Sequence, residues 1–164
     1  MRMDTRNKIV QWATLKRRLN RWRKQGKKIA FTNGCFDILH CGHVRYLEQA
    51  KRNDRILVVG LNSDTSVRKI KGPKRPIVPQ KARAAVLAAL ACVDYVTIFN
   101  EETPQRIIAT LKPDVLIKGA DWKDKGIAGS DVVKQSGGRV EYVQCVPGFS
   151  STNMIKAILK KCAA

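Results

Sequence analysis

The sequence predicts an α/β protein with a doubly wound sheet of five parallel strands and helices on both faces. Short apolar runs alternate with segments of helical periodicity from residue 28 to the end of the chain. One run, ILVVGL within residues 54–62, has no polar side chain, as is typical of a strand buried on both faces of a parallel sheet. The 164 residues, which contain no internal repeat, suit one domain with a substantial core.

The first predicted element is a basic amphipathic helix over residues 5–27, ending near Gly26. Its apolar stripe recurs at helical spacing among many Lys and Arg residues, and consists of Trp12, Leu15, Leu19 and Trp22. Such a stripe usually packs on its own domain, although a basic helix can also lie on a membrane or on RNA. We expect residues 1–26 to form a helix packed on the domain, and residues 27–164 to form the domain that carries the motifs below.

The remaining elements alternate along the chain. The predicted strands are residues 28–33, 54–62, 94–99, 114–119 and 139–146, and the predicted helices are 43–52, 80–93, 103–112, 130–138 and 150–161. Thr103 suits an N-cap followed by Pro104, and Ser150 suits the N-cap of the last helix. This order predicts a Rossmann-like sheet with right-handed crossovers.

Residues 66–80 break the alternation. With three prolines, one glycine and five basic residues, this stretch is expected to be a mobile loop, either a lid that orders on binding or a plain surface loop.

Charge and composition limit the function classes. The formal charge of +19 attracts anions, whether nucleic acid, nucleotides or sugar phosphates, and does not choose among them. No apolar run approaches the roughly 20 residues of a membrane span, and the N-terminus lacks a signal-peptide core, so a cytoplasmic protein without a membrane partner is expected. The five scattered cysteines form no CxxC pair and indicate neither a disulfide framework nor a zinc ribbon.

Small and polar residues follow four of the predicted strands. Ligands of doubly wound sheets bind at the carboxyl ends of the strands, so these segments predict one binding site. The segments are residues 33–37 leading to His40 and His43, residues 62–64, residues 118–122 and residues 148–152.

The two histidines allow three interpretations. A zinc site needs at least a third ligand, for which Cys35 or Cys41 could serve, but HCGH lacks the usual spacing. A satisfied pair of core histidines is the second. Gly42 at a predicted helix start favours the third, a phosphate cradle, because free N–H groups, the helix dipole and two imidazoles one turn apart can all bind an anion.

Two motifs resemble those of a known superfamily. GCFDILHCGH resembles the first signature of the HxGH nucleotidyltransferases, and GFSSTNMI resembles the second. Over residues 27–161 the chain is most similar to the stand-alone form of the D-glycero-β-D-manno-heptose 1-phosphate adenylyltransferases, notably at LKPDVLIKGADW. The glycerol 3-phosphate and phosphoethanolamine cytidylyltransferases share the first motif, but their Arg-Thr-Glu-Gly-Ile-Ser second motif differs from residues 146–150.

The resemblance implies transfer of AMP from ATP, accompanied by Mg²⁺, to a sugar 1-phosphate of lipopolysaccharide inner-core synthesis. It implies catalytic roles for His40, His43 and Lys118. It implies a nucleotide site formed by Asn33, Gly34, Cys35, Phe36, His40, His43, Gly119, Asp121, Trp122, Phe149, Ser150, Ser151 and Thr152, with no chemistry for the Cys35 thiol. It implies a sugar-phosphate site formed by Asp37, Asn62, Asp64, Arg75 and Arg83.

Several alternatives remain open at this point. Asp37 either orients donors in its turn or helps to hold Mg²⁺, Trp122 binds the nucleotide or only packs, and Arg83 reaches the site or is a solvated helix residue. Relatives in the superfamily are often oligomers, so a homodimer is expected, with no nucleic-acid partner. The competing functions are nucleotidyl transfer from ATP or CTP to another small phosphate of the glycerol 3-phosphate type, and nucleic-acid binding without catalysis.

Overall fold

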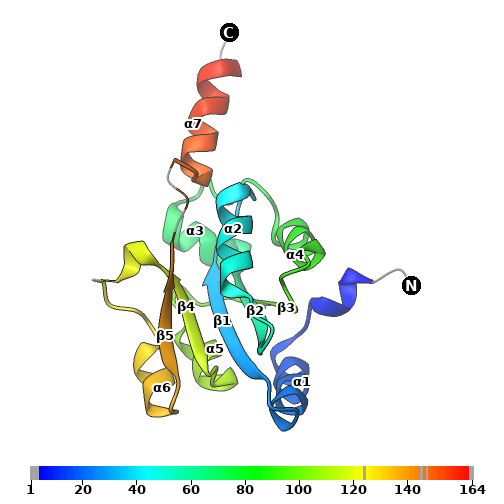
Figure 1. Cartoon of the computed structure of the whole chain (residues 1–164). Helices are drawn as coiled ribbons and strands as arrows, with labels where there is room; N and C mark the ends of the chain where they lie inside the picture. Colours follow the sequence, from blue (N-terminus) through cyan, green and yellow to red (C-terminus); the bar gives the residue numbers. More distant parts are fainter. Residues whose placement is uncertain (1–3, 124, 145, 147, 163–164) are drawn as a thin grey trace.

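The computed structural model describes residues 4–123, 125–144, 146 and 148–162. Over these residues the chain forms one five-stranded parallel sheet in the order β3-β2-β1-β4-β5 (Figure 1). The strands are β1 (Lys28–Gly34), β2 (Arg55–Asn62), β3 (Tyr95–Phe99), β4 (Val115–Gly119) and β5 (Arg139–Val143). In chain order, β2 and β3 are added on one side of β1, and β4 and β5 are then added on its other side. The predicted fold class is therefore confirmed, with a switch point between β1 and β4.

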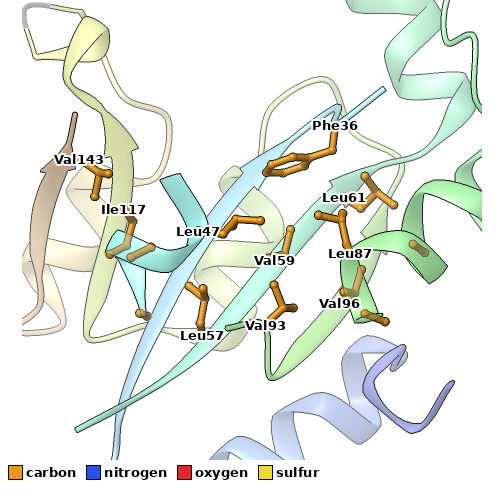
Figure 2. Close-up of a cluster of buried hydrophobic side chains, with 14 of the residues drawn as sticks. Phe36, Leu47, Leu57, Val59, Leu61, Leu87, Val93, Val96, Ile117 and Val143 are labelled. Atoms are coloured by element: carbon orange, nitrogen blue, oxygen red, sulfur yellow. The ribbon is translucent and has the colours of Figure 1, made fainter. Parts of the chain in front are cut away.

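Helices cover both faces of this sheet, because successive side chains of each strand point to opposite faces. On one face α2 (Cys41–Ala50) and α4 (Gln80–Ala89) pack over a cluster that includes Leu47, Leu57, Val59 and Leu87 (Figure 2). On the other face α1 (Trp12–Lys24), α5 (Gln105–Leu111) and α6 (Ser130–Gln135) enclose a second cluster. Every residue of β2 is buried, as its apolar sequence predicts.

The N-terminal segment lies against the edge strand β3. Trp12 donates from Nε1 to the Ile98 carbonyl oxygen at 2.9 Å, and Trp22 donates to the Tyr95 hydroxyl at 3.0 Å, while Leu15 and Leu19 are fully buried. The α-helix begins at Trp12, later than expected. A short 3₁₀-helix (η1, Thr5–Lys8) precedes it, and Val10 donates its N–H to Val96, so this part of the chain runs beside β3.

Three local predictions differ from the structure. The first half of the expected loop is a helix, α3 (Asp64–Lys71), because the Ser63 hydroxyl caps it by accepting the Ser66 N–H at 3.2 Å, and Val67 is buried. Pro104, not Thr103, occupies the N-cap of α5. The strand expected over 139–146 ends at Val143, and its predicted residue Cys145 lies outside the described residues.

The sheet is unevenly paired around β1. Its register with β2 runs along the whole strand, whereas its register with β4 is confined to Ala30–Val115 and Phe31–Leu116. Beyond these pairs a 3₁₀-turn, η2 (Ala120–Trp122), follows β4, and α7 (Ser151–Cys162) extends away from the sheet (Figure 1). No described helix is both long and apolar enough to cross a membrane.

Candidate active site

A cavity of about 610 Å³ lies at the carboxyl edge of the sheet. Its wall comes from the end of β1, the start of α2, the end of β4, the start of α7, the end of α3 and the loop before α5. It brings together most of the predicted site residues, namely Asn33, Gly34, Cys35, Phe36, Asp37, His40, His43, Asn62, Lys118, Gly119, Asp121, Trp122, Phe149, Ser150, Ser151 and Thr152.

The wall also includes residues that the sequence analysis did not select. They are Tyr46, Ile70, Lys71, Glu102, Thr103, Pro104, Gly126, Ala128 and Val146, whereas Gly42, which also lines the wall, had already pointed to the phosphate cradle. Residues 100–103, Asn-Glu-Glu-Thr, follow β3 directly, so the polar ending of this strand was a usable signal. Lys71 was missed because its helix was taken for a loop.

The histidines stand in a row of rings. The imidazoles of His40 and His43 stack with centroids 3.8 Å apart and planes 21° apart. Phe36 lies 5.1 Å from His43 on one side, and Phe149 lies 6.3 Å from His40 on the other. The Phe36 backbone is left-handed, with φ of 42°, a conformation that costs a non-glycine residue free energy and is common at functional turns.

Gly42 is needed for this arrangement. A Cβ atom at this position would lie 3.0 Å from His40 Nδ1 and 3.1 Å from Phe149 Cβ. His40 is the N-cap of α2, with extended backbone, and its carbonyl accepts the N–H of His43 at 2.9 Å. The first N–H groups of α2 have no acceptor within the helix, so they are available to an anion.

Three nitrogen atoms of the two imidazoles are buried without partners in the described part of the chain. Among the described residues, both ring nitrogens of His40 and Nδ1 of His43 have no hydrogen-bond partner. Burial lowers the pKa of His43 to about 4, helped by the charges of His40 and Lys71, and burial also lowers the pKa of His40. Both rings are therefore neutral at neutral pH, and each still carries one N–H donor. Buried polar atoms without partners are rare in folded proteins, and a ligand bound in this cavity would satisfy them.

Lys118 connects β4 to β1 at the switch point. Its Nζ donates to Asn33 Oδ1 at 2.7 Å and lies 5.5 Å from the centroid of the Trp122 ring. Burial lowers the pKa of Lys118 to about 8, so it remains mostly charged at neutral pH. Trp122 is 42% exposed at the cavity wall, which argues against a purely packing role.

Two hydroxyls at the start of α7 already have partners. Ser150 Oγ caps the helix, as predicted, by accepting the Asn153 N–H at 3.0 Å. Ser151 Oγ donates to the Ile38 carbonyl oxygen at 3.2 Å and so attaches α7 to the turn between β1 and α2.

Asp37 organises the segment after α3. Its carboxylate accepts from Arg75 Nε at 2.6 Å, from the Ile77 N–H at 2.8 Å and from the Val78 N–H at 2.9 Å. Burial acts to raise the pKa of Asp37, but the N–H groups of Val78 and Ile77 and the Arg75 guanidinium outweigh it and hold the pKa below its usual value. This geometry fits the orienting role and does not fit a magnesium ligand, because both oxygens are occupied.

Three of the residues expected at the sugar phosphate lie outside the described cavity wall: Asp64, Arg75 and Arg83. Arg75 pairs with Asp37 instead. Arg83 is neither solvated nor at the cavity. It is 2% exposed and donates to Asp64 at 2.7 Å, to the Val78 carbonyl at 2.8 Å and to the Cys35 carbonyl, so it joins α3, the following loop and the β1 turn.

No cluster of three or more His, Cys, Asp or Glu side chains suited to a metal ion occurs among the described residues. Cys35 lies in the cavity wall, where burial raises the pKa of its thiol, and Cys41 is exposed.

The residues that form the cavity lie within a segment that matches a known protein family. A family model described as cytidylyltransferase-like matches residues 31–157, a range that includes both signature motifs and the whole cavity wall. The chain belongs to the cytidylyltransferase-like family. Membership of this family establishes the nucleotidyltransferase class that the motifs predict.

Individual proteins support the same assignment. The chain is 59% identical over 136 residues to the bifunctional protein HldE of Geobacter metallireducens, covering 83% of this chain and 28% of the relative. It is 51% identical over 152 residues to the protein of the same name from Magnetococcus marinus, covering 93% of this chain and 31% of the relative. The chain thus spans about a third of the length of these curated relatives.

A solved structure is also similar. The lipopolysaccharide core biosynthesis protein of Thermoplasma volcanium matches with a TM-score of 0.59 and 28% identity, over 74% of this chain and 98% of that one.

Proposed function

We propose that the chain transfers AMP from ATP to D-glycero-β-D-manno-heptose 1-phosphate, producing ADP-heptose and pyrophosphate for lipopolysaccharide inner-core synthesis. The family supports nucleotidyl transfer, and the HldE relatives and the lipopolysaccharide core biosynthesis protein support this acceptor. The single observation that carries the catalytic part is the stacked pair of imidazoles at the start of α2, whose buried ring nitrogens have no partner among the described residues.

The reaction is an in-line substitution at phosphorus. An oxygen of the sugar 1-phosphate forms a bond to the α-phosphorus of ATP, and the bond from that phosphorus to the bridging oxygen of the β-phosphate breaks. Pyrophosphate leaves with the electron pair. The nucleophile is already an anion at neutral pH, so no residue is assigned as a general base.

Catalysis then depends on position and charge, because a triphosphate and a monophosphate repel each other. The N–H groups of His40 and His43 and the free backbone N–H groups of α2 would hold phosphate oxygens. Lys118 would add a positive charge from the opposite side of the switch point. These donors already stand in place, so little reorganisation is needed as charge develops.

Magnesium would enter with the ATP phosphates and help to neutralise their charge. Asp37 does not fit as its ligand, and we assign it no ligand from the protein. A dimeric state, a cytoplasmic location and the absence of a nucleic-acid partner belong to the same proposal.

The proposal is tested by a pyrophosphate-release screen that crosses ATP and CTP with heptose 1-phosphate, glycerol 3-phosphate and phosphoethanolamine. We expect the highest kcat/KM for ATP with heptose 1-phosphate and no release when the acceptor is omitted. A preference for CTP with glycerol 3-phosphate would replace the proposed substrates within the same family. RNA binding with steep salt dependence and no pyrophosphate release would instead support the nucleic-acid function.

A further inference from the structure

Glu102 is the acidic group of the cavity wall that has no task in the fold. The other carboxylates of the wall are Asp37 and Asp121. Asp37 accepts hydrogen bonds from Ile77, Val78 and Arg75, the last of which is also an ion pair, and Asp121 makes an interaction of its own. Within the described parts of the chain, the Glu102 carboxylate makes no hydrogen bond or ion pair. Glu102 is exposed where it lines the cavity. A carboxylate that lines a ligand cavity and has no partner within the described chain is a candidate for contact with the ligand.

The loop that carries Glu102 is firmly held by the residue before it. The Glu101 carbonyl accepts the Ser66 hydroxyl of α3 at 2.7 Å, and its carboxylate accepts from Arg106 at 3.0 Å. Pro104, just after Glu102, is buried at the start of α5. Neighbouring glutamates therefore have different roles: Glu101 fixes the loop to α3 and α5, and Glu102 faces the cavity.

The negative charge of the Glu102 carboxylate limits the kinds of ligand group that it can bind. The same wall contains donors and cations that suit phosphate oxygens, including His40, His43, Lys71 and Lys118. A carboxylate repels phosphate, so it would oppose a ligand that consisted of phosphate alone. Carboxylate oxygens accept strong hydrogen bonds from hydroxyl groups, which a sugar presents in numbers.

The position of Glu102 favours contact with the sugar-phosphate acceptor over contact with the nucleotide. Its loop contacts α3 through Glu101, and α3 ends with Ile70 and Lys71 in the same wall. The charge of Lys71 contributes to the lowered pKa of His43, so Lys71 lies close to the cradle. An acceptor whose phosphate lies at His43 and Lys71 would extend its hydroxyl-bearing carbons toward this loop.

We propose that Glu102 determines specificity by accepting hydrogen bonds from hydroxyls of the sugar-phosphate acceptor. This inference rests on the proposed function. It extends that function by naming a recognition group for the polyhydroxyl part and by predicting exclusion of acceptors with a second phosphate at that place.

The test is steady-state pyrophosphate release by Glu102→Ala and Glu102→Gln. Loss of a hydrogen bond to a charged group is expected to lower kcat/KM for the acceptor about 10- to 100-fold in Glu102→Ala. The change should lie in the acceptor KM, with the KM for ATP unaltered, and Glu102→Gln should be intermediate because it keeps one acceptor oxygen. Glu48→Gln, an exposed carboxylate of α2 outside the cavity wall, is the matched control and should behave as wild type.

An unchanged acceptor KM in Glu102→Ala, or a change in the KM for ATP instead, would overturn the inference. So would selection of phosphoethanolamine as the best acceptor, because Glu102 would then pair with an ammonium group. If wild type releases no pyrophosphate with any acceptor, the proposed function itself fails. Calorimetric titration of heptose 1-phosphate into wild type and Glu102→Ala then decides the role of Glu102, since equal affinities would exclude it.

Discussion

The two ends of the sheet treat buried polar groups in opposite ways. At the amino end charged groups pair with opposite charges: the buried Arg55 donates to Glu141 at 2.8 Å, and the half-buried Lys51 donates to Asp94 at 2.5 Å. At the carboxyl end His40 and His43 have buried ring nitrogens that bond to nothing in the described chain. The charged pairs of the amino end are formed within the chain, whereas the histidine nitrogens of the carboxyl end are left for a ligand.

This contrast separates stability from activity. Breaking a pair at the amino end should weaken folding and leave turnover unchanged per folded molecule. Removing an imidazole at the carboxyl end should reduce turnover and leave folding nearly intact, because no described partner inside the protein loses a hydrogen bond.

The largest expected effect is on stability, from Glu141→Ala. This substitution leaves Arg55, which is 1% exposed, without its principal partner, and loss of one member of a buried pair costs about 3–5 kcal/mol. Urea unfolding measures the loss. The exposed pair between Arg45 and Glu48 is the control, and Glu48→Ala should cost at most about 1 kcal/mol. Equal losses in the two variants would contradict the contrast between the ends.

The next effect is on catalysis, from His43→Ala. Removal of one preorganised donor to a developing charge typically lowers kcat by about 10²- to 10³-fold. Pyrophosphate release measures it, and the free energy of unfolding should stay close to that of wild type at pH 7. A folded His43→Ala protein with full turnover would exclude the phosphate cradle.

The two ends should also differ in the pH range over which they affect stability. The pKa of His43 is about 4 in the folded protein against an ordinary 6.5, so the unfolded chain binds a proton first. The contribution of neutral His43 is thus fully present above about pH 6.5 and is lost as the pH falls toward 4, with a magnitude of about 3 kcal/mol.

Glu141 acts at lower pH. Hydrogen bonds from Arg55, and then Arg139, outweigh burial and lower its pKa to about 2 from an ordinary 4.5, so its contribution is lost as the pH falls below about 4.5.

Urea unfolding between pH 7 and pH 5 tests the His43 contribution, because Glu141 stays largely ionised over this range. The urea midpoint should fall less steeply with falling pH in His43→Ala than in wild type. The same slope in both proteins would show that His43 is not buried as a neutral ring.

The smallest expected effect is on stability, from Asp37→Asn, at a residue that does not follow the contrast between the two ends. Asp37 lies at the carboxyl end but is fully paired, so Asp37→Asn should act on stability, with a loss of about 1–2 kcal/mol from weakened bonds to Arg75 and Ile77. Urea unfolding measures the loss, and limited proteolysis should find residues 73–79 easier to cleave. Lys74→Ala, an exposed neighbour in the same loop, should be close to neutral. Loss of Mg²⁺ dependence with unchanged stability would instead restore the metal-binding role.

The sequence predicted the features that depend on local pattern. The buried character of β2, the glycine between the histidines and the polar ends of β1 and β4 are visible within a few residues. Together they placed the cavity at the correct edge of the sheet. The α3 helix was missed because prolines and basic residues nearby suggested a loop, although Ser63 and Asp64 form an ordinary helix start.

The remaining errors concern partners distant in sequence. Asp37 and Arg75 are both charged residues near a motif, and either could face a ligand when read alone. Only the fold shows that they pair, because the contact joins the β1 turn to the segment after α3. Arg83 was misjudged for the same reason, since three segments converge on its guanidinium.

The short register between β1 and β4 explains why a cavity exists at all. After Phe31 and Leu116 the two strands no longer pair, and the sheet opens along this seam as the carboxyl edge is approached. Lys118 and Asn33 form a side-chain cross-tie over the opening where backbone hydrogen bonds would otherwise run. Asn33, Gly34, Lys118 and Gly119 all follow the last residues at which the two strands pair, and all four line the cavity, so the binding site begins where the pairing of β1 and β4 stops.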